Sequence, residues 1–314
     1  MTPNEIILEH VCCECGSNID NPVLIGKDWI NNLTGEFQIV RCTQCGLMRT
    51  NPRPTKETIG FYYPDSYAPY LTTQIKPNTK PKKIRKGIEK YIANPFQANS
   101  KSILPKNKAG HLLEIGCGSG DFLMAMQQQG WLVDGLEYSE SATENAKQQG
   151  LNVQCSSLEA IQLPKNKYDM IVAWMVIEHL HHPVAGLEKL YQALNECGVL
   201  VISVPDTGGI DFKLFKEYYY ALHLPNHLYH FTKPSLNQLI LKAGFKKSRF
   251  FWQRNPNNLL SSLIRVLDNN QKTKAANLVR SILARNRLRW LSKLLGLILA
   301  LIHQSGRMTV WAYK

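Results

Sequence analysis

The sequence contains no apolar run long enough to cross a bilayer, which takes about 20 residues. Its first ten residues also lack the basic start and the apolar core of a secretory signal peptide. Both absences argue against an integral membrane protein and a secreted one. We therefore expect a cytoplasmic protein, whose contact with a membrane would be peripheral and at the inner face.

Acidic residues are scarce, with 24 Asp and Glu against 37 Lys and Arg, which gives a formal net charge of +13. The basic residues crowd into two stretches, 76–90 and 272–293. Such runs are typical of contact with nucleic acid, acidic lipid or a negatively charged substrate, or of a solvated surface. Composition alone leaves these interpretations open.

Cysteine is concentrated near the N-terminus, in two C-x-x-C-G knuckles. The predicted ligands are Cys12, Cys15, Cys42 and Cys45. Two knuckles at this spacing predict a Cys₄ zinc ribbon, and four protein ligands leave no open position, so the zinc would be structural. Disulfides are the alternative, which a cytoplasmic setting disfavours, and a redox pair would normally lie beside a βαβ unit.

The most informative stretch is a glycine-rich loop after an apolar run. Gly116, Gly118 and Gly120 follow Glu114, and Glu137 ends the next apolar run. An acid in that place can accept the hydroxyl protons of a ribose. The dinucleotide fingerprint is disfavoured, because Asp121 occupies the place of its third glycine and would compete with a phosphate at the helix N-terminus.

The spacing E-x-G-x-G-x-G resembles motif I of class I S-adenosylmethionine-dependent methyltransferases. The resemblance covers residues 109–253 and the last strand, and it includes segments 168–173, 176–180, 198–205 and 308–313. The start of the chain, with its two knuckles and Asn51-Pro52-Arg53-Pro54, resembles a bacterial subgroup linked to surface glycan biosynthesis.

This resemblance implies an α/β, Rossmann-like fold with a seven-stranded, mostly parallel sheet and helices on both faces. Strands are expected at 111–115, 132–136, 152–155, 168–173, 198–204, 245–253 and 308–313, the last one antiparallel. Helices are expected at 119–129, 140–149, 183–195 and 233–243. The predicted units are the ribbon (1–55), an aromatic segment and basic linker with a short helix at 84–93 (56–108), the main domain (109–253 and 306–314) and a helical insertion (254–305).

The resemblance also implies which residues hold S-adenosylmethionine. The set is Glu114, Gly116, Cys117, Gly118, Gly120, Glu137, Tyr138, Ser157, Leu158 and Trp174. Glu137 would accept the ribose hydroxyls and Tyr138 would flank the adenine. An acid is commonest where Ser157 stands, so the chain departs from the family pattern there.

Histidines supply the candidate general bases, because their pKa lies near neutrality. His179 follows the fourth strand and His227 lies in the loop 218–231, which we expect to overhang the site. A role in orienting loops is the alternative for both. A metal site at His227 and His230 is disfavoured, since the sequence offers no third ligand nearby. Aromatic residues at 61–70 either cap the cofactor, whose sulfonium an aromatic face attracts, or pack the ribbon onto the main domain.

The predicted function is O-methylation of a sugar hydroxyl, on a glycan precursor or a glycolipid. RNA methylation is the alternative, because the ribbon and the positive charge suit a phosphate backbone. It is less favoured, since the Asn/Asp-Pro-Pro-Tyr pattern of amino-nitrogen methylation is missing after the fourth strand. A non-catalytic ribbon scaffold is a third interpretation. The basic, amphipathic insertion 254–305 would contact an acidic membrane surface or pack on a subunit.

Overall fold

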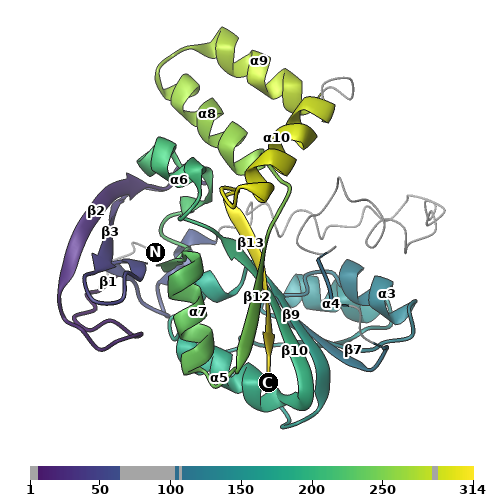
Figure 1. Cartoon of the computed structure of the whole chain (residues 1–314). Coiled ribbons are helices and arrows are strands. Elements are labelled where there is room, and N and C mark those ends of the chain that lie inside the picture. Colours follow the sequence, from purple (N-terminus) through teal and green to yellow (C-terminus); the bar gives the residue numbers. More distant parts are fainter. Residues whose placement is uncertain (1–5, 64–102, 106–107, 285–288) are drawn as a thin grey trace.

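The computed structural model describes residues 6–63, 103–105, 108–284 and 289–314 (Figure 1). The predicted linker helix at 84–93 and the first basic stretch lie outside these residues.

A seven-stranded sheet forms the centre of the molecule. Its strands are β6 (His111–Ile115), β7 (Leu132–Glu137), β8 (Asn152–Cys155), β9 (Tyr168–Trp174), β10 (Leu194–Pro205), β12 (Lys247–Trp252) and β13 (Arg307–Tyr313). They lie in the order β12-β13-β10-β9-β6-β7-β8, and β13 is antiparallel to both of its neighbours. The predicted fold class, including the antiparallel last strand, is confirmed.

Two pairs of helices cover the two faces of this sheet (Figure 1). The first pair is α3 (Asp121–Gln127) and α4 (Glu140–Gln148), and the second is α5 (Pro183–Ala193) and α7 (Lys233–Lys242). Successive strand residues pack on opposite faces: Leu112 lies in the apolar cluster with α3, and Leu113 lies in the cluster with α5 and α7. Burial on both faces explains why the strands read as continuous apolar runs.

Two predicted helix ends are wrong by a few residues. The helix expected from 119 begins at Asp121, because Gly120 has a φ of 87° and serves as a left-handed N-cap. The helix expected to reach 195 ends at Ala193, and Leu194 already pairs with Tyr168 as the first residue of β10. The left-handed backbone of Gly120 delays the start of the first helix, and the pairing of Leu194 with Tyr168 ends the second one early.

The N-terminal part forms a second sheet, which the larger domain completes. It contains β2 (Asp20–Lys27), β3 (Glu36–Cys42) and β4 (Met48–Thr50), and β11 (Tyr229–His230) pairs with β4 in the order β11-β4-β3-β2. A short ladder joins β1 (Ile6–Ile7) to β5 (Arg53–Pro54), and η1 (Ile59–Tyr62) follows. This sheet lies on the side of α5 and α7.

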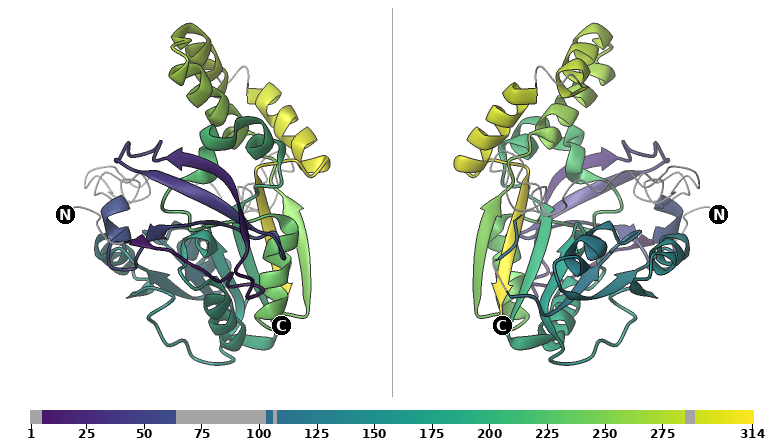
Figure 2. Two further views of the ribbon diagram at one scale, coloured as in Figure 1. Left: turned by 90° about the vertical axis from the view of Figure 1, so that its left-hand side faces the viewer. Right: turned by 90° about the vertical axis from the view of Figure 1, so that its right-hand side faces the viewer.

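Three helices form an arm between β12 and β13, which confirms the predicted helical excursion. They are α8 (Asn257–Asn269), α9 (Thr273–Ala284) and α10 (Arg289–Leu301), and they project away from the sheet in every view (Figures 1 and 2). Shorter helices lie between β10 and the loop that carries β11, and they contact α8 of the arm. They are α6 (Ile210–Phe215), η4 (Lys216–Tyr218) and η5 (Tyr220–Leu222). Among the described residues, no helix is long and apolar enough to cross a membrane.

Candidate active site and metal centre

A cavity of about 920 Å³ opens at the carboxyl ends of the parallel strands. In a sheet of this kind, ligands bind at this edge. The predicted residues in its wall are Gly116, Glu137, Tyr138, Ser157, Leu158, Trp174, His179 and His227. Glu114, Cys117, Gly118 and Gly120 are not in the wall. They lie in β6 and in the loop behind Gly116, where Glu114 and Cys117 are buried.

The glycine loop and Glu137 are held together by direct hydrogen bonds. The Gly118 N–H donates to Glu137 Oε2 over 2.8 Å, and the Ser139 N–H donates to Oε1 over 2.9 Å. Each carboxylate oxygen has two lone pairs, so both retain an acceptor site after these bonds. The carboxylate is therefore fixed in orientation and able to accept further hydrogen bonds from a diol.

Two of the loop's glycines occupy positions where any side chain would be strained. Gly116 has a φ of 68°, and a Cβ built on it would lie 3.0 Å from Val176 Cγ2. Gly120 has a φ of 87°, and its Cβ would lie 2.2 Å from Leu151 Cδ1. A side chain on Gly116 would also fill part of the cavity wall. The loop thus leaves room for a ligand against bare backbone.

The fit of S-adenosylmethionine to this half of the cavity rests on two further observations. The indole Nε1 of Trp174 is buried and has no hydrogen-bond partner in the described part of the chain, so it offers a donor to a ligand. Tyr138 lies on the rim with 70% of its surface exposed, where its ring can cover an adenine. These residues fit the nucleoside that the sequence predicts.

The adenine end departs from the family pattern, as the sequence predicts. Ser157 Oγ accepts a hydrogen bond from the Ala160 N–H over 3.1 Å. Glu159 is the nearest following acid, but its carboxylate lies 3.6 Å from Lys56 Nζ and accepts a hydrogen bond from the His182 N–H. It therefore positions the segment after η3 (Ile177–His179), and it also lies in the cavity wall.

The predicted bases lie together in a cluster of histidines at the other half of the cavity. The rings of His179 and His227 are 4.6 Å apart, and the His223 ring is 4.9 Å from that of His227. His179 Nδ1 lies 2.8 Å from Tyr63 Oη and 3.0 Å from the Asn226 carbonyl, while His227 Nδ1 donates to the Ala221 carbonyl over 2.9 Å. The loop 218–231 overhangs the site as expected.

Burial keeps this cluster uncharged. It lowers the pKa of His179 to about 3 and that of His223 to about 4, and it lowers the pKa of His227 well below its usual value. Neighbouring imidazoles add to the effect, since two adjacent positive charges would repel each other. All three histidines are therefore neutral at physiological pH, and each is a weaker base than the near-neutral imidazole that the sequence predicted.

Glu178 joins this cluster, although the sequence did not mark it. Its carboxyl is fully buried and makes no hydrogen bond to a described residue, and burial raises its pKa to about 8. Single ligand atoms of Glu178, His179 and His227 lie within 4.8 Å of one another. His230 is not part of the group, because its Nε2 lies 3.1 Å from Thr50 Oγ1. Among the described residues, His230 is in neither of the groups of potential metal ligands.

The aromatic segment is described as far as Tyr63, and its residues contact both the cavity and the ribbon. Tyr63 lines the cavity and contacts His179. Tyr62 is buried against Phe37 of β3, with ring centroids 5.6 Å apart. Tyr67 and Tyr70 lie outside the described residues.

Two arginines of the N-terminal part are fully buried, and one of them, Arg53, links this part to the site. Arg49 forms a two-pronged ion pair with Asp20, at 3.0 and 2.6 Å. Arg53 pairs with Glu9, donates to the His181 carbonyl over 3.1 Å and lies over the Tyr229 ring. Sequence reasoning treated Arg53 only as part of a turn.

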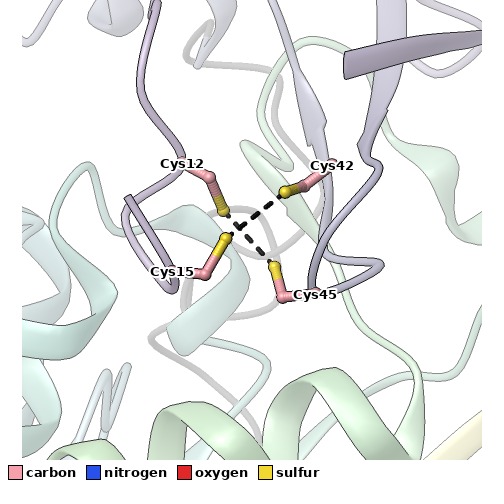
Figure 3. Close-up of side chains that lie close together, drawn as sticks. All are labelled: Cys12, Cys15, Cys42 and Cys45. Atoms are coloured by element: carbon pink, nitrogen blue, oxygen red, sulfur yellow. Dashed lines mark hydrogen bonds between the residues drawn. The ribbon is translucent and has the colours of Figure 1, made fainter. Parts of the chain in front are cut away.

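The four predicted cysteine ligands converge from two loops (Figure 3). Cys12 Sγ lies 3.5 Å from Cys45 Sγ, Cys15 Sγ lies 3.4 Å from Cys42 Sγ, and all four sulfurs are within 4.8 Å of one another. A tetrahedral zinc with Zn–S bonds of about 2.3 Å places its sulfurs about 3.8 Å apart. The cluster is close to that size, so the four thiols fit a zinc ion.

Residues 85–248 match the family described as a methyltransferase domain. The chain belongs to the methyltransferase domain family. This match and the sheet described above confirm the methyltransferase prediction and the cofactor that it implies, S-adenosylmethionine. The non-catalytic scaffold loses its support, since the match covers the strands that form the cofactor half of the cavity.

Three similar proteins illustrate the range of this family. The chain is 29% identical over 121 residues to a ubiquinone biosynthesis O-methyltransferase of Coxiella burnetii, covering 37% of this chain and 49% of that protein. It is 26% identical over 163 residues to a probable S-adenosylmethionine-dependent methyltransferase of Mycobacterium tuberculosis, covering 50% and 57%. A solved S-adenosylmethionine-dependent methyltransferase of Mesorhizobium loti is 17% identical, with a TM-score of 0.46 over 68% of this chain and 95% of that one. The chain spans about half the length of the curated relatives it matches.

Proposed function

We propose that this methyltransferase transfers the methyl group of S-adenosylmethionine to a hydroxyl of a sugar, in a glycan precursor or a glycolipid. The observation that carries the proposal is one cavity with two unlike halves. The strands β6, β7 and β8 supply the glycine loop, Glu137 and Tyr138, and the loops after β9 supply uncharged histidines. A hydroxyl acceptor needs such a base, and one relative is named an O-methyltransferase.

The cofactor supplies an activated methyl group on a sulfonium. The chain's residues would hold it by the ribose hydroxyls at Glu137, by the backbone at Gly116 and by the ring of Tyr138. Since the displacement is in line, the remaining task of the protein is to orient the acceptor and to remove its proton.

His179 is our candidate for the base. It borders the cavity at the end of β9, and it is less buried than His227, which packs behind it. The hydrogen bonds of its Nδ1 with Tyr63 and Asn226 orient the ring. Its Nε2 is then the atom that would accept the hydroxyl proton.

Replacing His179 with glutamine should lower kcat about 100-fold, the usual contribution of a general base, while the KM for S-adenosylmethionine changes less than about twofold. Titration of His179 should not lower the wild-type rate between pH 8 and 6, because burial holds its pKa near 3 and the ring stays neutral. The control is His182→Gln, three residues away and exposed. Equal rates for His179→Gln and wild type would exclude His179 as the base.

We propose that the four-cysteine cluster holds a structural zinc ion. Four thiolates would complete its coordination, so the ion would have no open position for a substrate. Its role would be to fix the two knuckles and, through β4 and β11, the histidine loop.

We also propose that the arm contacts an acidic membrane surface. Leu291, Leu294, Ile298 and Leu301 are exposed and recur at helical spacing along α10, so they form one apolar stripe. Residues 257–303 contain eight Lys and Arg and one acidic residue, Asp268. An apolar stripe within a basic segment is typical of helices that lie in a membrane interface.

The full chain should float with vesicles that contain acidic lipid. A triple variant with serine at Leu291, Leu294 and Ile298 should lower the bound fraction by at least about tenfold, because each side chain loses roughly 1.5–3 kcal/mol of burial. The matched control places serine at Leu132, Leu214 and Leu241, which are equally exposed elsewhere. If both variants float like the wild type, the arm has another partner.

The acceptor class is tested by incubating the full chain with S-adenosylmethionine labelled in its methyl group. One arm contains nucleotide-activated and lipid-linked sugars, and the other contains total RNA. We expect label in the sugar fraction as an alkali-stable methyl ether. Label confined to RNA would overturn the sugar proposal and leave the cofactor assignment intact.

A further inference from the structure

Arg307 occupies the far end of the cavity from the adenine site. It is the first residue of β13, opposite Pro205 at the end of β10. Because β13 runs antiparallel to β10, its first residue lies at the same edge as the carboxyl ends of the parallel strands. Two strand spacings separate β13 from β9, or about 10 Å, so Arg307 lines the cavity from the side of the sheet opposite to β7 and β8.

The guanidinium has no partner of its own. Among the described residues, no carboxylate lies within 4.0 Å of its nitrogens, and its Nε is buried without a hydrogen-bond partner. An arginine is always charged, and a partly buried charge is costly unless it is paired. Within the part of the chain that the structure describes, the cavity therefore contains a cation with no anion paired to it.

The nearest acids do not cancel this charge. Burial raises the pKa of Glu178 to about 8 and that of Asp211 to about 7. The charge of Arg307 acts on Glu178 in the opposite direction, yet the effect of burial is larger. At neutral pH Glu178 is mostly neutral and Asp211 is about half ionised, so the two acids do not fully offset the charge of Arg307.

The backbone around Arg307 is rigidly held. The Gly306 carbonyl accepts hydrogen bonds from Tyr219 Oη and Asn258 Nδ2, each over 2.9 Å. The Arg307 carbonyl accepts one from the Gln253 N–H over 3.0 Å. These bonds fix the backbone of Arg307 at the edge of the cavity.

We propose that Arg307 binds an oxyanion of the acceptor, a phosphate or a carboxylate, while the hydroxyl to be methylated lies at His179. The acceptor would then be an anionic sugar. The planar guanidinium matches both groups through two parallel hydrogen bonds. This inference rests on the proposed function for the hydroxyl, whereas the anion site itself does not depend on it.

The anion site is tested by titrating inorganic phosphate, and separately acetate, into the full chain saturated with S-adenosylhomocysteine. Arg307→Gln should lower the affinity for the anion by about tenfold or more, since charge-assisted hydrogen bonds are roughly twice as strong as neutral ones. Arg307→Lys should restore part of this affinity, because it keeps the charge. Arg280→Gln is the matched control, because Arg280 is an exposed arginine of the arm paired with Asp268. All variants should bind S-adenosylhomocysteine with unchanged affinity, which shows that they are folded.

Equal anion affinity in wild type and Arg307→Gln, or no saturable anion binding by the wild type, would overturn the site. A second measurement compares methyl transfer to a sugar phosphate, a uronic acid and a neutral sugar. We expect transfer to one of the anionic sugars, identifying phosphate or carboxylate, with Arg307→Gln raising its KM. Anion binding without any transfer would retain the site and reject the proposed function, and a preference for the neutral sugar would reject the acceptor class.

Discussion

Replacing Cys42 with serine should remove the zinc and lower the melting temperature of the full chain by about 10 °C or more. A structural zinc site contributes roughly 10–16 kcal/mol in small domains, and a loss of even a few kcal/mol shifts the melting point by several degrees. The effect should reach the active site, because β4 of the zinc-bearing sheet pairs with β11 of the histidine loop. Methyl transfer should therefore fall with the zinc content.

The matched control is Cys13→Ser, since Cys13 is adjacent to a predicted ligand and lies outside the cluster of four. It should retain one zinc per chain and a melting temperature near that of the wild type. Metal content by mass spectrometry and melting by calorimetry measure both variants. A Cys42→Ser protein that keeps its zinc, or a Cys13→Ser protein that loses it equally, would contradict the four-cysteine assignment.

Replacing Glu137 with alanine should raise the dissociation constant for S-adenosylmethionine by about 100-fold. The carboxylate accepts hydrogen bonds from Gly118 and Ser139, and we propose that it also accepts those of the ribose hydroxyls. Hydrogen bonds to a charged group contribute roughly 1.5–3 kcal/mol each, and 1.4 kcal/mol corresponds to a factor of ten.

Glu144→Ala is the control for this measurement, because Glu144 is an exposed acid on α4. It should bind S-adenosylmethionine as the wild type does. Glu137→Gln should fall between the two, since an amide keeps one acceptor oxygen and loses the charge. An unchanged affinity in Glu137→Ala would mean that the ribose is held elsewhere.

The central sheet is predictable because its pattern is local. Each strand is a short apolar run, each helix follows within a few residues, and the glycines after β6 mark the edge where a ligand binds. Glu137 is predictable for the same reason, since it ends the strand next to β6.

The link between the ribbon and the active site had no local pattern to reveal it. Tyr229 pairs with Arg49, which lies in a distant part of the sequence. The strand β11 has only two residues, too few to show an alternating apolar pattern. Arg53 likewise lies in a Pro-rich turn whose partners, Glu9 and His181, come from distant segments.

Arg307 was not predicted as a site residue, although the topology of the sheet places it at the cavity. An antiparallel last strand must begin at the carboxyl edge of its parallel neighbours, so its first residues face the site. We expected that strand to begin at residue 308, one residue after its actual start. Glu178 was missed because its burial, which shifts its pKa, depends on contacts with the loop 218–231.

The most direct test of the central claim is a calorimetric titration of the full wild-type chain with S-adenosylmethionine. We expect one molecule bound per chain with a dissociation constant on the order of micromolar, about −8 kcal/mol, and displacement by S-adenosylhomocysteine. A folded, zinc-loaded chain that shows no heat of binding and no thermal stabilisation by either compound would contradict it.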